Sequence, residues 1–278
     1  MSFRQFKLVT KDGLSLFGLV WTPPGKIRAV LGLVHGLGEH SGRYEEFAAR
    51  LGEEGLAVLA FDQRGFGRSP GARGYINTYD DLLDDIGGLL HEKENLFPDQ
   101  KCFLYGHSMG GSLVLNYALR RRPDLAGVVA TGPWLKLAWE PGRLMTSLAA
   151  AMNVVRPGLT QPNGLDPVLL CRDPDVVRAY VDDPLVHDRI SARLFTASRQ
   201  AGRWALANAA DFPVPLLLMH GGADRITSRA ASREFAARVR GDCTFKLWEG
   251  YYHELHNEPQ NGEFYDFLAG WLEEHLTP

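Results

Sequence analysis

The 278-residue sequence lacks the features that mark several large classes of protein. Its three cysteines, Cys102, Cys171 and Cys243, are far apart and form no C-x-x-C pair, which argues against a disulfide framework and a cysteine zinc site. No segment reaches the ~18 apolar residues that a membrane-spanning helix needs. Residues 1–7 lack the apolar stretch of a signal peptide. We therefore expect a reduced, cytoplasmic protein.

An excess of one charge is also missing. The formal net charge is -3, from 30 basic and 33 acidic residues. The densest basic run, at residues 120–122, ends a predicted helix, where cations interact favourably with the helix dipole. Nucleic-acid binding is therefore not indicated. His35 and His40 have no third ligand nearby, so their spacing is a weak signal for zinc, and we expect no metal site.

Predicted strands and helices alternate along most of the chain. Segments 3–10 and 15–22 predict a β-hairpin around a Lys-Asp-Gly turn. Apolar runs typical of strands buried on both faces occupy residues 29–34 and 56–61. Further strands are predicted at residues 102–105, 127–131, 216–220 and 244–248. Patterns typical of helices occupy residues 44–54, 79–97, 111–121, 229–240 and 263–275. This alternation predicts an α/β fold with a mostly parallel, doubly wound sheet.

Residues 132–211 interrupt the alternation. We expect no buried strand there, only helical pieces separated by Pro141, Pro157, Pro162, Pro167, Pro174 and Pro184. A helical insertion near the carboxyl edge of a parallel sheet is well placed to cover the ligand crevice of such sheets. We therefore predict a helical cap over residues 132–211, between two core segments at residues 1–131 and 212–278.

A candidate nucleophile lies in Gly106-His107-Ser108-Met109-Gly110, which matches G-x-S-x-G. The pattern alone is weak, because an ordinary glycine-rich turn also matches it. Here it follows a predicted strand and precedes a predicted helix, as the motif requires. The flanking glycines lack the Cβ atoms that would clash in a strained turn, and the helix N-terminus favours developing negative charge. We predict that Ser108 is a catalytic nucleophile.

A glycine-rich loop, His35-Gly36-Leu37-Gly38-Glu39-His40, follows the predicted strand 29–34. In hydrolases with this serine turn, one oxyanion donor is the backbone N–H after the nucleophile, and the other comes from the loop after the third strand. The predicted donors are therefore the N–H groups of Met109 and Leu37. A simple surface turn is the alternative for this loop, within which we expect His35 to form a hydrogen bond.

The acid and the base are expected after the serine, in the order Ser, Asp or Glu, His. Asp224 follows the predicted strand 216–220, and His253 follows the last predicted strand. His256 competes with His253 as the base, but it is further from the strand end. A solvated loop carboxylate or a helix cap is the alternative for Asp224. Asp62 also follows a strand, but it precedes the serine, so we expect it to tie down the Arg64 loop.

These motifs together resemble the monoacylglycerol lipase and lysophospholipase family of α/β-hydrolases over nearly the whole chain. The matching segments are residues 35–44, 106–111, 183–187, 223–225 and 252–256. The resemblance implies an esterase or lipase for monoacylglycerols or similar medium-to-long acyl esters, with neither a metal nor an organic cofactor. It also favours His253 over His256 as the base. In that family, residues at the positions of Arg43 and His107 lie near the polar glycerol end of the substrate.

The chain departs from the family in two places. The family often has D-H-x-G-H-G-x-S where this chain has Asp62-Gln63-Arg64-Gly65-Phe66-Gly67-Arg68-Ser69, so both histidines are replaced. That loop holds no triad member, and catalysis is therefore not in question. Outside residues 183–187 the cap is divergent, and the cap selects acyl chain and head group.

Two questions stay open at this point. Residues 144–155 are apolar and almost uncharged, and they either pack over the pocket or contact lipid aggregates from an exposed face. The same catalytic groups would also serve a lysophospholipase, a short-chain esterase or a peptide hydrolase. A noncatalytic binding protein is a more remote alternative, because such proteins usually lose a triad member. Oligomeric state is not encoded in these motifs.

Overall fold

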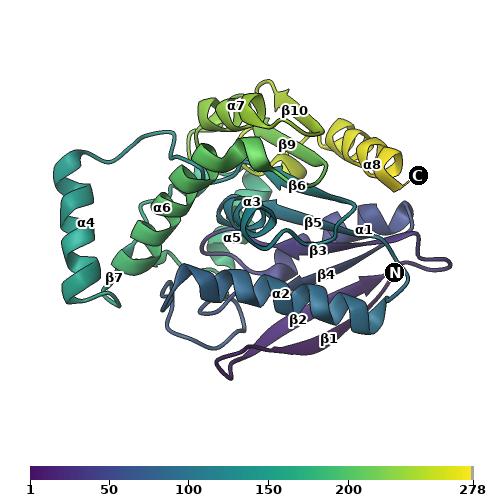
Figure 1. Ribbon diagram of the computed structural model, residues 1–278, viewed down its shortest axis with the longest axis horizontal. Coiled ribbons are helices and arrows are strands. Elements are labelled where there is room, and N and C mark those ends of the chain that lie inside the picture. Colours follow the sequence, from purple (N-terminus) through teal and green to yellow (C-terminus); the bar gives the residue numbers. More distant parts are fainter. Residues whose placement is uncertain (277–278) are drawn as a thin grey trace.

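An eight-stranded sheet runs through the computed structural model, which describes residues 1–276 (Figure 1). The strand order is β1 (Ser2–Val9), β2 (Ser15–Thr22), β4 (Leu56–Phe61), β3 (Ala29–Val34), β5 (Cys102–His107), β6 (Gly127–Thr131), β9 (Leu216–Gly221) and β10 (Cys243–Trp248). β2 pairs antiparallel with β1 and β4, and every pair from β4 to β10 is parallel. The predicted mostly parallel sheet is confirmed.

Helices cover both faces of this sheet. α1 (Glu45–Glu53) and α8 (Gly262–Leu276) pack on one face, and α2 (Tyr79–Leu96), α3 (Met109–Arg121) and α7 (Arg229–Arg238) pack on the other. Neighbouring residues of β5 divide between the two layers: Leu104 packs with α2 and α3, and Phe103 and Tyr105 pack with α1 and α8. Because both faces are buried, the central strands are unbroken apolar runs rather than alternating ones.

The observed elements differ from the predicted ones mainly at their ends. The helix expected from residue 44 begins as a 3-10 turn, η1 (Ser41–Tyr44), before α1. β5 continues through His107, and α3 begins at Met109 instead of Gly111, so that Ser108 alone separates strand from helix. α7 ends at Arg238. The α3 difference matters most, because it puts the first free N–H groups of the helix directly beside the serine.

Between β6 and β9 the chain forms the segment that we call the cap, residues 132–211. It contains α4 (Arg143–Val155), β7 (Thr160–Pro162), η2 (Pro167–Leu169), α5 (Pro174–Asp182), β8 (Arg189–Ser191), α6 (Ala192–Asn208) and η3 (Ala209–Asp211). In Figure 1, α4 lies at one end of the molecule, away from the sheet. α6 packs on α3, where Asn116 Nδ2 donates to the carbonyl of Ala201. Within residues 1–276, no helix has the length and apolar character needed to cross a bilayer.

Candidate active site

Ser108 occupies the strained turn between β5 and α3. Its backbone lies at φ 56° and ψ −116°, a conformation that costs energy for a residue with a Cβ. A Cβ on Gly106 would overlap the carbonyl of Gly110, and a Cβ on Gly110 would overlap the carbonyl of Val34. The Ser108 N–H donates to the carbonyl of Thr131 at 2.9 Å, which joins the turn to β6. Only glycine therefore fits two residues before and two residues after the serine.

Asp224 and His253 meet at the carboxyl ends of β9 and β10. His253 Nδ1 lies 2.7 Å from Asp224 Oδ2, and both side chains are buried. The other carboxylate oxygen, Oδ1, accepts the N–H groups of Ile226 at 2.7 Å and Thr227 at 3.1 Å. Asp224 is therefore fixed in place by its own loop and is not a solvated loop residue.

A second histidine, which the sequence analysis did not single out, contacts the same carboxylate. His220, near the end of β9, places Nε2 3.1 Å from Asp224 Oδ2, and its Nδ1 lies 2.9 Å from Ser232 Oγ. Thr227 Oγ1 also donates to Asp224 Oδ2, at 2.9 Å. The only sequence signal for His220 was a polar residue inside an otherwise apolar strand.

The electrostatics of the pair favour an ionised acid and a basic imidazole. Burial disfavours the charged carboxylate, but the nearby His253 and His220 outweigh it and hold the pKa of Asp224 well below its usual value of 3.8. Burial likewise disfavours a charged His253, but Asp224 overcomes it and raises the pKa of His253 above 6.5. The pair therefore has the polarity of a carboxylate that stabilises an imidazolium.

His256 lies behind His253 rather than beside a carboxylate. It is buried, its ring stacks on Tyr44 with centroids 5.0 Å apart, and neither ring nitrogen has a hydrogen-bond partner among the described residues. Burial lowers the pKa of His256 to about 4. The ring of His107, next to the serine, lies 4.6 Å from that of His253 and 5.5 Å from that of His256. Of the two candidate bases, only His253 bonds the acid.

The loop that carries Leu37 lies against the serine. A Cβ on Gly36 would stand 3.2 Å from Ser108 Cβ, so that this backbone passes directly beside the serine. Glu39 Oε1 accepts the N–H of Gly36 at 2.6 Å, and it also accepts the hydroxyl of Tyr44 at 2.8 Å. Glu39, which belongs to the same loop as Gly36, therefore stabilises the conformation of that loop. Met109 is the first residue of α3, on the other side of Ser108.

His35 and Asp62 hold neighbouring parts of this region. His35 Nδ1 lies 2.8 Å from its own loop's Gly36 carbonyl, and its Nε2 accepts the N–H of Gln63 at 2.9 Å. Asp62 accepts the N–H of Ser41 and, from its own loop, the N–H of Arg68, each at 2.8 Å. Asp62 thus ties down the loop that contains Arg64, as expected, and also joins it to the loop of Ser41.

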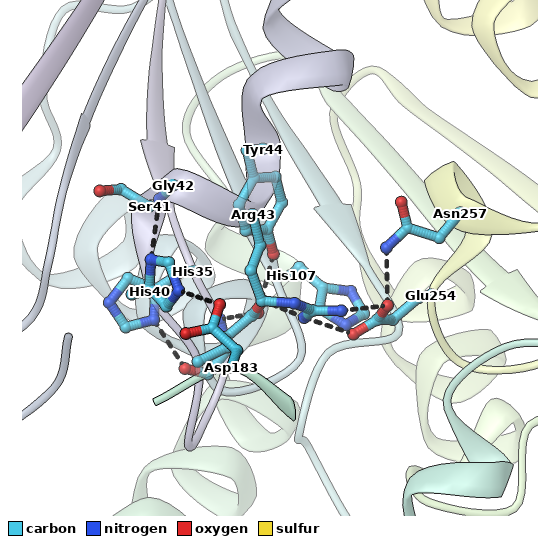
Figure 2. A network of polar contacts seen from close by, with 12 residues as sticks. His35, His40, Ser41, Gly42, Arg43, Tyr44, His107, Asp183, Glu254 and Asn257 are labelled. Atoms are coloured by element: carbon cyan, nitrogen blue, oxygen red, sulfur yellow. Dashed lines mark hydrogen bonds and ion pairs between the residues drawn. The ribbon is translucent and has the colours of Figure 1, made fainter. Parts of the chain in front are cut away.

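Arg43 does not line the substrate cavity, unlike the contact that the family resemblance implied. Its guanidinium donates to Glu39 at 2.6 Å. It also donates to both carboxylate oxygens of Glu254, at 2.7 and 2.9 Å (Figure 2). Burial disfavours the charge of Arg43, but the two glutamates raise its pKa. Arg43 in turn outweighs the effect of burial on Glu254 and lowers the pKa of that carboxyl. Arg43 therefore bridges the loop of Leu37 to the loop of His253.

Ser108 and His253 open onto a cavity of about 750 Å³ beneath the cap. His107, Glu39 and Glu254 also line it. Much of the wall is apolar and comes from the cap, including Trp134, Met145, Leu148, Met152, Leu159 and Phe195. An apolar wall of this kind favours a ligand with a hydrocarbon chain, whose polar end would lie at the small polar site.

The described residues contain no cluster of three or more histidine, cysteine or acidic side chains arranged to hold a metal ion. Cys102, Cys171 and Cys243 are free thiols. The site brings together a serine, an imidazole and a carboxylate beside backbone N–H groups.

Comparison with known proteins places this site in a family. A family model described as serine aminopeptidase, S33, matches residues 25–260. A monoacylglycerol lipase of Mycolicibacterium smegmatis is 36% identical over 259 residues, which cover 92% of each chain. The chain belongs to the monoacylglycerol lipase family of α/β-hydrolases. The predicted family and fold are confirmed, and the chain is a serine hydrolase of the carboxylic ester class.

Two further relatives of this α/β-hydrolase extend the comparison. A crystal structure of the monoacylglycerol lipase from Paleococcus ferrophilus superimposes with a TM-score of 0.86 at 38% identity, covering 94% of this chain and 99% of that one. An uncharacterized abhydrolase domain-containing protein of Dictyostelium discoideum is 39% identical over 97% of this chain. The chain spans 29% of that longer protein.

Proposed function

We propose that this hydrolase cleaves monoacylglycerols or similar medium-to-long acyl esters, with Ser108 as nucleophile, His253 as base and Asp224 as the orienting acid. The observation that carries the proposal is the buried 2.7 Å contact between His253 and Asp224, on the same cavity as a strained serine. Strain at a single serine, held by glycines that cannot be replaced without overlap, is typical of a nucleophile turn.

The proposed reaction is a two-step acyl transfer. The Ser108 hydroxyl attacks the ester carbonyl as His253 takes its proton, and Asp224 stabilises the imidazolium. The N–H groups of Leu37 and Met109 bind the oxyanion of the tetrahedral intermediate. The alcohol leaves with the proton from His253. Water activated by the same imidazole then releases the fatty acid.

The substrate class follows from the cavity and the relatives. The apolar cap residues along the cavity suit an acyl chain, and the polar groups beside Ser108 suit an alcohol with free hydroxyls. His107, which lines the cavity, is the proposed polar contact. We assign Arg43 to positioning instead, because its donors are held by Glu39 and Glu254. Two relatives named monoacylglycerol lipase support the same substrate class.

We further propose that the enzyme works in the cytoplasm and contacts lipid aggregates through α4. Free cysteines suit a reducing compartment. Every residue of α4 is at least partly exposed, and Leu144, Val154 and Val155 are 86%, 81% and 73% exposed. Exposed apolar side chains gathered on one helix usually mark an interaction surface.

The test is a profile of hydrolysis rate against acyl length for mono-, di- and triacylglycerols. Lysophospholipids, short p-nitrophenyl esters and aminopeptidase substrates are measured beside them as alternative substrates. We expect the highest kcat/KM for monoacylglycerols, and no turnover by Ser108→Ala. Preference for a peptide amide would contradict the substrate class. Absence of fluorophosphonate labelling on folded protein would contradict the mechanism and favour a binding protein.

A further inference from the structure

One part of the cap docks on the loops that carry the catalytic groups, and it does so at both of its ends. This part, residues 170–187, consists of α5 with the short segments before and after it, and we call it the strap. We propose that the strap fixes the loop of Leu37 and the loop of His253 in one geometry, with Arg172 and Asp183 as positioning residues. The proposal rests on the proposed function.

The first end of the strap joins the loop of His253. The carbonyl of Leu170 accepts the N–H of Glu254, the residue after the base, at 2.7 Å. The thiol of Cys171 donates to the carbonyl of Asn257 at 2.8 Å. Both strap residues are buried. The base loop therefore has backbone contacts to the cap on the C-terminal side of His253.

Arg172 reaches the N-terminal side of the same loop through a buried glutamate. Its Nε donates to Glu258 Oε2, and Glu258 Oε1 accepts the N–H of Tyr252 at 2.8 Å. The Glu258 side chain is 0% exposed, so its charge has little solvent to stabilise it and depends on Arg172. Through this chain of contacts Arg172 helps to hold the residue that directly precedes His253.

The second end of the strap joins the loop of Leu37, which we call the oxyanion loop. Asp183 Oδ2 lies 2.8 Å from His40 Nε2 (Figure 2). The N–H of His187 donates to the carbonyl of Gly38 at 3.0 Å. The fit is close, because a Cβ on Gly38 would stand 2.7 Å from the carbonyl oxygen of His187. Leu37, whose N–H is the proposed oxyanion donor, precedes this contact.

The middle of the strap covers the ion bridge between the two loops. The ring of Tyr180, in α5, lies 4.7 Å from the guanidinium carbon of Arg43, and Tyr180 is buried. Arg43 pairs with Glu39 of the oxyanion loop and Glu254 of the base loop. The strap and Arg43 thus each connect the same pair of loops. By contrast, α4 has no buried residue, so it forms an outer part of the cap, whereas the strap forms an inner part.

Acyl transfer needs the oxyanion donor and the base in place at the same moment, and small displacements of catalytic groups are costly. A strap that positions them should control kcat for every ester. A strap that only covers the pocket should affect KM for long acyl chains. The two roles therefore predict different kinetics on a short, soluble ester that does not need the cap for binding.

The test uses Arg172→Ala and Asp183→Ala in the full chain, with Arg172→Lys and Asp183→Asn as conservative variants. Arg178→Ala is the matched control, because Arg178 is an exposed residue of α5 whose ion pair, to Asp175, is also exposed. The measurements are kcat and KM on p-nitrophenyl butyrate, the rate of fluorophosphonate labelling, and the melting temperature.

We expect both alanine variants to be folded and to lose about 10- to 100-fold in kcat and in labelling rate, with KM for the short ester little changed. The conservative variants should recover part of the loss, and Arg178→Ala should match the wild type. Should an alanine variant fail to fold, its conservative variant must still show reduced kcat. Unchanged kcat on the short ester in folded variants would overturn the proposal. A wild-type enzyme that neither labels nor turns over would instead contradict the proposed function itself.

Discussion

His253 and Asp224 are joined at 2.7 Å with both side chains buried, and the contact raises the pKa of the imidazole above 6.5. The base must be neutral to accept the serine proton. We therefore expect kcat/KM to fall as the pH drops through this raised pKa, with a midpoint above 6.5. Asp224→Asn removes the charge that raises the pKa and leaves the opposing effect of burial, so the midpoint should move to lower pH. A pH profile on a soluble ester checks both. A midpoint that Asp224→Asn leaves in place would contradict the assignment.

Asp224→Asn should also reduce kcat by roughly 10⁴-fold, because an asparagine favours the wrong tautomer of His253. Thr227→Ala is a milder companion, since it removes one of the donors to Asp224 Oδ2 and leaves the carboxylate in place. Steady-state rates of the two variants, with melting temperatures as the folding control, should therefore fall in that order. Equal losses of kcat in the two variants would show that the charge of Asp224 does not contribute to catalysis.

His253→Ala should be far more damaging to kcat than His256→Ala. His256 has no carboxylate partner, its pKa lies near 4, and it stacks on Tyr44. We expect His256→Ala to lower stability by about 2 kcal/mol through lost packing and to leave most of the chemistry intact. Rates measured beside unfolding curves separate the two effects. The reverse ranking of rates would make His256 the base.

The sheet, the serine turn, and the places of Asp224 and His253 after strand ends follow from local patterns in the sequence. Buried strands are apolar runs, and the strained turn admits only glycine two residues before and two residues after Ser108. The ion bridge was not predictable in this way: Arg43 and Glu254 are 211 residues apart, and nothing local to either indicates the pairing. The family resemblance therefore suggested a substrate contact for Arg43, whereas tertiary packing gives its guanidinium to two glutamates.

The glycines two residues before and after Ser108 provide a test of the turn itself. An alanine at Gly110 would overlap the backbone of β3 at Val34, which cannot move without disturbing the sheet. We expect Gly110→Ala to lower the free energy of unfolding by about 3 kcal/mol or more and to abolish activity. Gly270→Ala is the control, because Gly270 lies in α8 with open space around it and alanine should add about 0.5–1 kcal/mol. Denaturant unfolding of both variants gives the comparison; a stable, active Gly110→Ala would refute the geometry.

Arg43→Met separates a structural role from a substrate contact. Removal of the guanidinium leaves Glu39 and Glu254 buried without their cation, which should cost about 3–5 kcal/mol. Without Arg43, burial should raise the folded-state pKa of Glu254 above its unfolded value. The variant should then be most stable at low pH and lose stability as the pH rises through that folded-state pKa. Unfolding curves at pH 5 and pH 8 measure this trend. A stable variant whose only change is a raised KM would instead show that Arg43 contacts the substrate.

The exposed apolar side chains of α4 predict an effect that depends on the physical state of the substrate. Leu144, Val154 and Val155 do not line the cavity, so their replacement by serine should leave turnover of a soluble ester unchanged. If each contributes about 1 kcal/mol when half-buried in a lipid interface, the triple variant should bind vesicles about two orders of magnitude more weakly. Hydrolysis of aggregated monoacylglycerol should fall with it. Val9→Ser is the control, because Val9 is also 73% exposed but lies on the edge strand β1, outside the cap. Equal vesicle binding by wild type, triple variant and control would remove α4 as the contact surface.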